Sequence, residues 1–190
     1  MAMIKVAGKT VYKAIARGPI LVMDKQEMDI TAATVADAEA EVARVTEAIE
    51  IAKVQIAKLY DKAWAEVGEE SAAIFEVHQM MLEDDEYLDS IFSMIRDEGL
   101  NGVYAVKMTG DTFSQIFACM DDEYMNARSA DVRDMSHRLY DILCGNTGFQ
   151  LPEGSFLLVA EDLAPSETIQ LPRERIMAFV TRQGSASSHT

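Results

Sequence analysis

One long apolar stripe between residues 35 and 63 constrains the fold of this chain more than any other feature. Apolar side chains recur there in steps of three and four, which is the period of one face of an α-helix. The stripe consists of Val35, Ala38, Val42, Val45, Ile49, Ala52, Ile56, Leu59 and Ala63. A stripe of this length suits a coiled coil or one arm of a helical bundle. The further helices that follow after short breaks favour the bundle.

Four shorter helical patterns follow, and glycines punctuate them. Gly68 ends the long stripe, Gly99 and Gly102 close the third pattern, and Gly145 stops the fifth. The four patterns are marked by Ile74, Val77 and Met81; by Leu88, Ile91, Phe92 and Ile95; by Val103, Val106, Phe113, Ile116, Phe117 and Met120; and by Tyr124, Arg128, Val132, Met135, Leu139 and Ile142. Residues 31–145 are therefore predicted to form an all-α subdomain.

Both ends of the chain have the pattern of short strands and turns. In the first thirty residues Ile4, Val6, Val11 and Ile15 alternate with polar or small residues. Apolar runs of strand length lie at 156–160 and 176–181, joined by a turn-rich connection. Because the early strands have no helical partner of their own, we expect residues 1–30 and 146–190 to form one discontinuous α/β subdomain, incomplete at its carboxyl end. The helical bundle is inserted into it, and the fold class is α+β.

Charge and composition exclude several kinds of function. The net charge of −15 argues against nucleic-acid binding, which needs a surplus of Lys and Arg. No apolar run is long enough for a membrane span, and the first residues lack a signal peptide, so we expect a cytoplasmic protein without membrane contact. Between residues 66 and 98 eleven acids face one base, Arg96. This segment is either a solvated face or a docking surface for a basic partner.

The sequence offers few candidates for chemistry. Cys119 and Cys144 lack metal-site spacing and are expected to be buried free thiols. The nucleotide-binding and acyl-transfer motifs are absent, so no metal or cofactor is expected in this chain. His78 and His137 lie in helical patterns, where a structural or surface role is the simplest interpretation. His189 follows a small-residue segment that could hold an anion, and an imidazole there could accept a phosphoryl group; a flexible tail explains the same segment.

Five ordered stretches resemble Enzyme I, the phosphoenolpyruvate–protein phosphotransferase of the bacterial phosphotransferase system. Residues 8–19 resemble its opening strands, and residues 73–84 resemble its "IFExHxMxLED" helix. Residues 124–134 resemble "YxxxRxxDxRD". Residues 161–168 and 184–190 resemble "xDLxPSxT" and the phosphohistidine motif "GGxTSHT", with Ser185 and Ser187 replacing the usual glycine and threonine. The resemblance spans nearly the whole chain.

The resemblance implies roles for particular residues. His189 would accept phosphoryl from phosphoenolpyruvate, at Nε2, and pass it to a histidine of the small carrier HPr during sugar uptake. Thr168 would orient the imidazole. The HPr-binding face would comprise Glu69, Glu70, Ala73, Glu76, His78, Met80, Met81, Asp85, Glu86, Tyr124, Met125 and Arg128. Exposed methionines would supply adaptable apolar contacts there.

The resemblance also implies limits and leaves alternatives. The carboxyl-terminal barrel of the family, which binds phosphoenolpyruvate and Mg²⁺ and drives dimerisation, is not in this sequence. We therefore expect this chain to be a monomer that binds HPr but handles phosphoryl groups poorly. A nitrogen-branch paralogue of Enzyme I, a phosphohistidine domain of pyruvate phosphate dikinase or phosphoenolpyruvate synthase, and a non-enzymatic docking module for a basic protein are the alternatives.

Overall fold

A computed structural model of the chain describes residues 7–11, 13–23, 30–146 and 151–182. These residues fall into two compact units. The strand unit holds the described residues up to 23, together with 151–163 and 172–182. The helical unit holds residues 30–146 and 164–171. Helices and a small parallel sheet occur together, which confirms the predicted α+β class.

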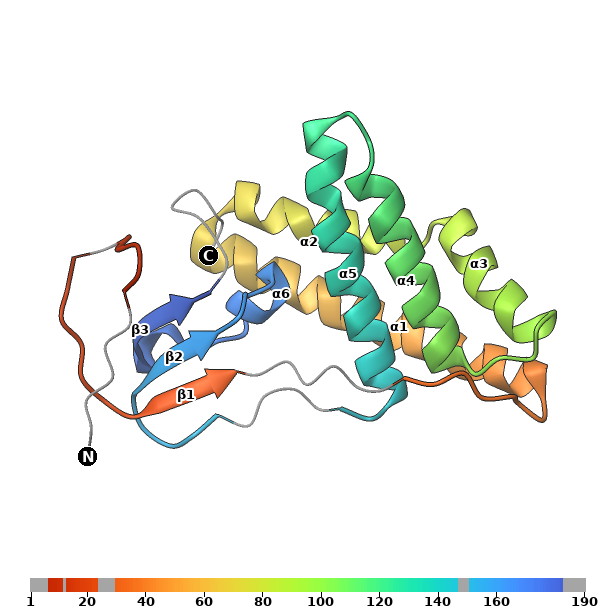
Figure 1. The fold of residues 1–190 in the computed structure, drawn as a ribbon, viewed down its shortest axis with the longest axis horizontal. Coiled ribbons are helices and arrows are strands. Elements are labelled where there is room, and N and C mark those ends of the chain that lie inside the picture. Colours follow the sequence, from red (N-terminus) through yellow and green to blue (C-terminus); the bar gives the residue numbers. More distant parts are fainter. Residues whose placement is uncertain (1–6, 12, 24–29, 147–150, 183–190) are drawn as a thin grey trace. The chain divides into compact units, whose positions relative to one another are not determined.

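Five long helices build the helical unit (Figure 1). They are α1 (Ala38–Val67), α2 (Glu69–Met81), α3 (Asp85–Arg96), α4 (Gly102–Ala118) and α5 (Glu123–Leu143), and the short α6 (Pro165–Thr168) packs with them. Aspartate side chains cap three of these helices. Asp37 accepts a hydrogen bond from the Ala40 backbone N–H at 3.0 Å. Asp84 and Asp122 do the same at the starts of α3 and α5.

The long stripe forms the core side of α1, except at its first residue. Val35 was predicted to be helical, but it precedes the Asp37 cap and its N–H donates to the Gly99 carbonyl at 2.8 Å. Thr34 forms an antiparallel bridge with Leu100. The chain before α1 is therefore tied to the loop between α3 and α4 instead of extending the helix.

Gly102 was predicted to close the third helix, but it is the first residue of α4. Its N–H donates to Glu41 Oε1 of α1 at 2.6 Å. A Cβ at this position would lie 2.4 Å from Val45 Cγ2, so the close approach of α1 requires glycine here. The third helix, α3, ends earlier, at Arg96, and Gly99 follows with a φ of +68°.

The buried faces of α2 and α4 coincide only in part with the predicted stripes. On α2 the buried residues are Ala72, Phe75 and His78, whereas Ile74, Val77 and Met81 are half-buried. On α4 mainly small residues are buried, namely Gly102, Ala105, Val106, Thr109, Gly110 and Ser114. Of the predicted stripe, Ile116 and Met120 are exposed and Phe113 and Phe117 are half-buried. Helix α4 therefore approaches its neighbours mainly through small residues, whereas α2 buries Phe75 and His78, and both helices keep other large apolar residues near the surface.

The strand unit contains a three-stranded parallel sheet in the order β1-β2-β3, formed by Ile20–Met23, Phe156–Ala160 and Ile176–Thr181. Val11 and Ile15, which were predicted to be in a strand, lie outside it and are exposed. Ile4 and Val6 lie outside the described residues. A single 3-10 turn, Arg173–Arg175, precedes β3.

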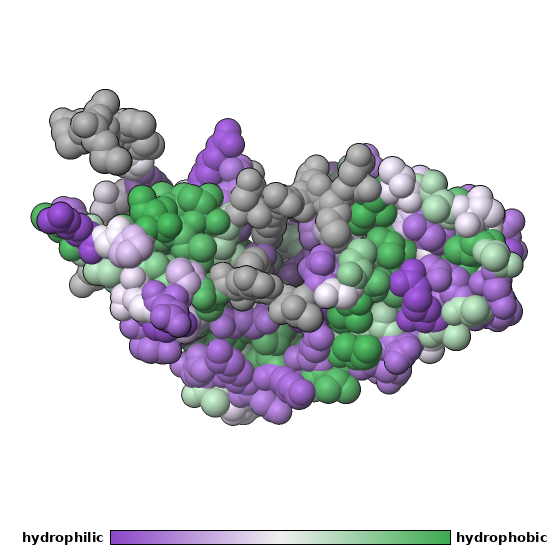
Figure 2. Space-filling model, turned by 90° about the horizontal axis from the view of Figure 1, so that it is seen from below, coloured by the Kyte–Doolittle hydropathy of each residue, from purple (hydrophilic) through white to green (hydrophobic). Residues whose placement is uncertain are grey.

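One face of this sheet is apolar and open to solvent. The register pairs Ile20 with Leu157 and Val22 with Val159, and Val159 in turn pairs with Val180, so these side chains share a face. Ile20, Val22 and Val180 are 64%, 63% and 61% exposed. The other face carries the buried Phe156 and Leu158. Figure 2 shows a hydrophobic patch over the strand unit.

Residues 164–171, between β2 and β3 in sequence, pack with the helices. Ile169 belongs to the helical core, and Leu171 is buried. The sequence prediction had grouped this segment with the strands.

Both cysteines are free, but Cys119 and Cys144 are exposed, so the expectation of buried thiols is wrong. Each follows the last residue of its helix, on a turn that the core does not cover. Within the described ranges, no helix is long and apolar enough to cross a bilayer.

Candidate functional site

The "YxxxRxxDxRD" stretch lies on α5 and connects three parts of the helical unit. Arg128 Nη1 donates to Asp131 Oδ2 at 2.9 Å, and Arg128 Nη2 donates to the Tyr124 hydroxyl at 2.7 Å. The guanidinium carbon also lies 4.5 Å from the centre of the Tyr124 ring. These three residues are spaced by three and four positions, so one face of the helix brings them together. They form a short chain of contacts from the surface inward.

Asp131 connects this chain to α2. Only 6% of its surface is exposed, and its second carboxylate oxygen, Oδ1, lies 4.0 Å from His78 Nε2. His78 is completely buried, with the edge of its ring against Phe75. Partial burial of Arg128 acts to lower its pKa. The hydrogen bonds that Arg128 donates to Asp131 and Tyr124 outweigh this effect, so the pKa of Arg128 is raised. Arg128 therefore stays charged.

Asp134, one turn further along α5, connects it to α6. The Ser166 hydroxyl donates to Asp134 Oδ1 at 2.7 Å, and the Ser166 backbone N–H donates to Oδ2 at 3.3 Å. Ser166 is buried. The motifs at 73–84, 124–134 and 161–168, which are far apart in sequence, thus meet on α5. Asp134 joins α6 to α5 by hydrogen bonds, and Asp131 lies beside His78 of α2.

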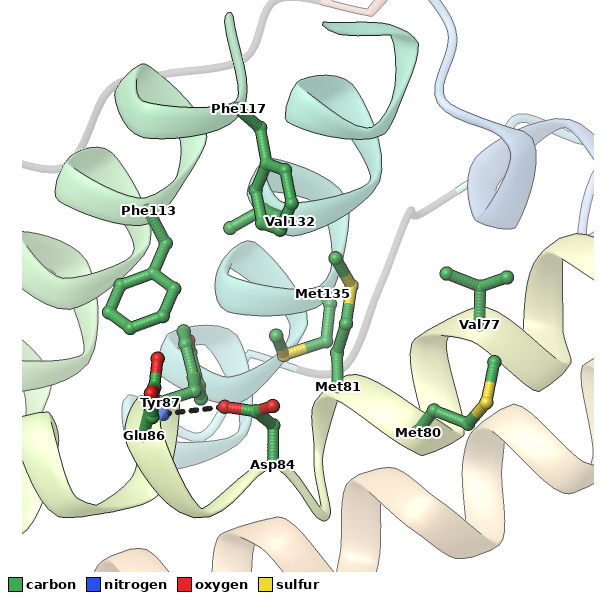
Figure 3. Close-up of a pocket in the computed structure, with 10 residues that line it drawn as sticks. All are labelled: Val77, Met80, Met81, Asp84, Glu86, Tyr87, Phe113, Phe117, Val132 and Met135. Atoms are coloured by element: carbon green, nitrogen blue, oxygen red, sulfur yellow. Dashed lines mark hydrogen bonds between the residues drawn. The ribbon is translucent and has the colours of Figure 1, made fainter. Parts of the chain in front are cut away.

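An apolar groove of about 230 Å³ opens between α2, α4 and α5 at the start of α3 (Figure 3). Three methionines contribute to it, Met80, Met81 and Met135. Its other lining residues are Val77, Asp84, Glu86, Tyr87, Phe113, Phe117 and Val132. Four of the half-buried apolar residues of α2 and α4 described above therefore form walls of this groove, namely Val77, Met81, Phe113 and Phe117.

Acidic side chains lie on the same helices as the groove. Glu69 and Glu70 occupy the first turn of α2, and Asp85 and Glu86 occupy the first turn of α3, where a helix dipole favours negative charge. Glu76, on α2, is also exposed. The surface thus combines exposed carboxylates with a methionine-rich apolar depression.

The structure separates the predicted binding residues into three groups. Most are exposed, as a docking surface requires: Glu69, Glu70, Ala73, Glu76, Met80, Asp85, Glu86 and Tyr124. Three are half-buried: Met81, Met125 and Arg128. His78 is buried, so its prediction as a contact residue is wrong; it faces the core beside Phe75 and Asp131.

The predicted phosphoryl-transfer residues are only partly described. His189 lies outside the described residues. Thr168 is half-buried at the end of α6, and its hydroxyl donates to the Ala164 carbonyl at 3.0 Å. No group of three His, Cys, Asp or Glu side chains that could hold a metal ion occurs in the part of the chain that the structure describes.

Sequence reasoning missed the wall of the groove on α4. Phe113 and Phe117 were assigned to an apolar stripe, and Asp84 and Tyr87 received no role. The spacing of four between the two phenylalanines, next to small buried residues on the same helix, was the available signal.

Comparison with known proteins decides the family. Residues 7–128 match the family described as "PEP-utilising enzyme, N-terminal". The chain belongs to this family. Among curated relatives, the phosphoenolpyruvate–protein phosphotransferases of Bacillus subtilis and Geobacillus stearothermophilus are 35% and 40% identical, over 88% and 83% of this chain. The chain spans only 30% and 28% of the lengths of these two relatives.

Two solved structures support the same family. A solution structure of an Enzyme I protein is 29% identical, with a TM-score of 0.71, and the match covers 86% of this chain and 68% of that one. An N-terminal domain of nitrogen Enzyme I is 28% identical with the same TM-score, covering 90% and 71%. The predicted resemblance to Enzyme I is confirmed.

Proposed function

We propose that this chain is the part of a phosphoenolpyruvate–protein phosphotransferase that docks the carrier HPr and exchanges phosphoryl with it through His189. The observation that carries the proposal is the surface on α2 and α3, where exposed carboxylates lie on the helices that border a groove lined by methionines. Acidic groups steer a basic partner, and methionines adapt to an apolar contact. The curated relatives are phosphoenolpyruvate–protein phosphotransferases, and this activity supplies the reaction.

The proposed reaction consists of two transfers. The His189 imidazole attacks phosphorus, the bond from phosphorus to the enol oxygen of phosphoenolpyruvate breaks, and pyruvate leaves after its enolate takes up a proton. A histidine of HPr then attacks the same phosphorus, and the N–P bond at His189 breaks. Thr168 Oγ1, which donates to Ala164, retains lone pairs that can accept a hydrogen bond from an imidazole N–H. The phosphoenolpyruvate site belongs to the part of the relatives that this chain does not match.

Titration with the HPr of Bacillus subtilis at low and high salt tests the docking. We expect affinity to fall as salt rises, because salt screens exposed charges. The double variant Asp85→Lys/Glu86→Lys should bind several-fold more weakly. Glu47→Lys changes an exposed acid on α1 and serves as the matched control. Equal affinity of the two variants, or binding indifferent to salt, would contradict the proposed surface.

Labelling by phospho-HPr tests the transfer separately from the docking. The wild-type chain should acquire an acid-labile phosphoryl group slowly, whereas His189→Ala should acquire none and still bind HPr. A non-enzymatic docking module would bind HPr but leave both proteins unlabelled.

A nitrogen-branch Enzyme I is the second candidate, favoured by the likeness to the nitrogen Enzyme I domain. It would use the same docking surface and the same histidine chemistry. Competition between the sugar-system HPr and its nitrogen-branch counterpart distinguishes the two, because the cognate carrier should bind more tightly.

A further inference from the structure

His78 has an arrangement that packing alone does not explain. It is fully buried in α2, and neither Nδ1 nor Nε2 has a hydrogen-bond partner. Buried polar groups are almost always bonded, because an unbonded one gives up its interaction with water without replacement. An apolar residue of similar size would fill the space beside Phe75 without this cost. The imidazole therefore points to a role beyond filling the core.

A chain of charged contacts leads from His78 to the surface. Nε2 lies 4.0 Å from Asp131 Oδ1, which is too far for a hydrogen bond and within ion-pair distance if the ring is protonated. The other oxygen of Asp131 accepts a hydrogen bond from Arg128, which in turn donates to the exposed Tyr124. One carboxylate thus stands between a buried imidazole and a cation of the proposed docking surface.

We infer that His78 is a positioning residue for this surface, and that proton uptake by His78 weakens the docking of a basic partner. The inference rests on the proposed function. A protonated ring has two N–H donors and a positive charge, so it draws the Asp131 carboxylate toward α2. Asp131 is then shared between two cations and neutralises Arg128 less completely. The surface gains positive charge, which a basic partner resists.

Asp131 is the acidic side chain that lies next to His78. The α1 residues that are buried are all apolar or alanine, so α1 brings no buried ionisable group toward α2. On α5, the charged residues on either side of Asp131 have bonds of their own: Arg128 to Asp131, and Asp134 to Ser166. Among the described residues, Asp131 is the only acid within 4.0 Å of His78. Glu76, on α2 itself, is exposed.

The affinity for Bacillus subtilis HPr, measured in a series of decreasing pH, tests the inference. We expect the wild-type chain to lose about fivefold in affinity as His78 takes up a proton, a typical size for coupling between two sites. His78→Gln removes the titrating group and should abolish the loss. His137→Gln is the matched control, because His137 is an exposed histidine of α5 that contacts Tyr140, and it should keep the loss.

A second measurement separates this inference from the proposed function. In the free protein, the Arg128 Nε–H resonance should shift with pH at the same midpoint as the ring protons of His78. Asp131→Asn should uncouple the two signals while leaving both groups in place. An unchanged pH dependence in His78→Gln, or an Arg128 signal indifferent to His78, would overturn the inference. Absence of HPr binding at every pH would overturn the docking proposal. The resonances of Arg128 and His78 in the free protein would still show whether these two residues are coupled.

Discussion

Asp131 and Asp134 lie three residues apart on α5, and each faces a different neighbouring segment. Asp131 faces α2 and Asp134 holds α6 through Ser166. Both belong to a stretch whose family resemblance suggested a surface for HPr. At the scale of single residues, the two carboxylates of this stretch face the interior, while Tyr124 reaches solvent.

Ser166→Ala should destabilise the helical unit, because it removes a buried hydrogen bond to a carboxylate. Bonds of this kind contribute roughly 1.5–3 kcal/mol. We expect a loss of about 2 kcal/mol in the free energy of unfolding measured with urea. Thr112→Ala removes an exposed hydroxyl that bonds within α4 and should change stability little. Equal effects of the two substitutions would show that the Asp134–Ser166 pair contributes nothing.

Because of Tyr87, the free energy of unfolding should decrease as the pH rises into the alkaline range. Its burial raises the pKa of the hydroxyl well above the usual value, although the hydrogen bond with Ser136 acts in the opposite direction. In the unfolded chain the same hydroxyl loses its proton near pH 10, so the stability it provides is complete below about pH 10 and declines above it. Urea unfolding at pH 8 and pH 11 should show a smaller decline for Tyr87→Phe than for wild type. Tyr104→Phe, on α4, should keep the wild-type decline.

At the scale of helices, α4 and α5 pack closely because small residues line the contact (Figure 1). A Cβ at Gly110 would lie 2.4 Å from Ser136 Oγ and 2.5 Å from Ser136 Cβ. The Ser136 hydroxyl also bonds with Tyr87 of α3. Gly110 of α4 therefore allows the close approach of Ser136 on α5, and Ser136 in turn contacts α3.

Gly110→Ala should destabilise the helical unit by roughly 1–3 kcal/mol, because overpacking outweighs the better helix propensity of alanine. Ser136→Gly removes the clashing atoms, so the double variant should be more stable than the sum of the single effects predicts. A thermal or urea unfolding series measures this coupling. Gly8→Ala, where a Cβ would meet nothing within 4 Å, is the control. Strict additivity of the two changes would contradict a direct contact.

The helices were predictable from the sequence because their apolar period is strong, and every predicted helix is present. Which side faces the core was less predictable. On α2 and α4, large apolar residues such as Val77 and Phe113 dominate the sequence pattern, yet His78 and Gly110 are buried. Tight helix contacts select small residues such as Gly110, and the burial of an imidazole at His78 is independent of hydrophobicity. Neither feature is visible in hydrophobic period alone.

At the scale of the whole molecule, the open face of the sheet is the largest departure from ordinary packing. Parallel sheets are usually covered on both faces, whereas Ile20, Val22 and Val180 are more than half exposed. An apolar face of this kind favours association with other hydrophobic surfaces.

We predict that this chain binds a hydrophobic dye such as anilinonaphthalene sulfonate, and that Val22→Lys/Val180→Lys reduces the fluorescence and any self-association seen by light scattering. Val54→Lys, at an exposed valine of α1, should leave both unchanged. Equal dye binding by all three proteins would place the apolar surface elsewhere.

The contribution of residues 164–171 to the helical unit limits how this unit can be moved between proteins. An excision at residues 26 and 150 would take the five long helices but leave behind Ser166 and Ile169. The transplanted bundle would carry an unmatched Asp134 and a hollow where Ile169 had been. Recombination in nature or in the laboratory would therefore have to transfer two separate stretches of gene together for the bundle to keep its stability.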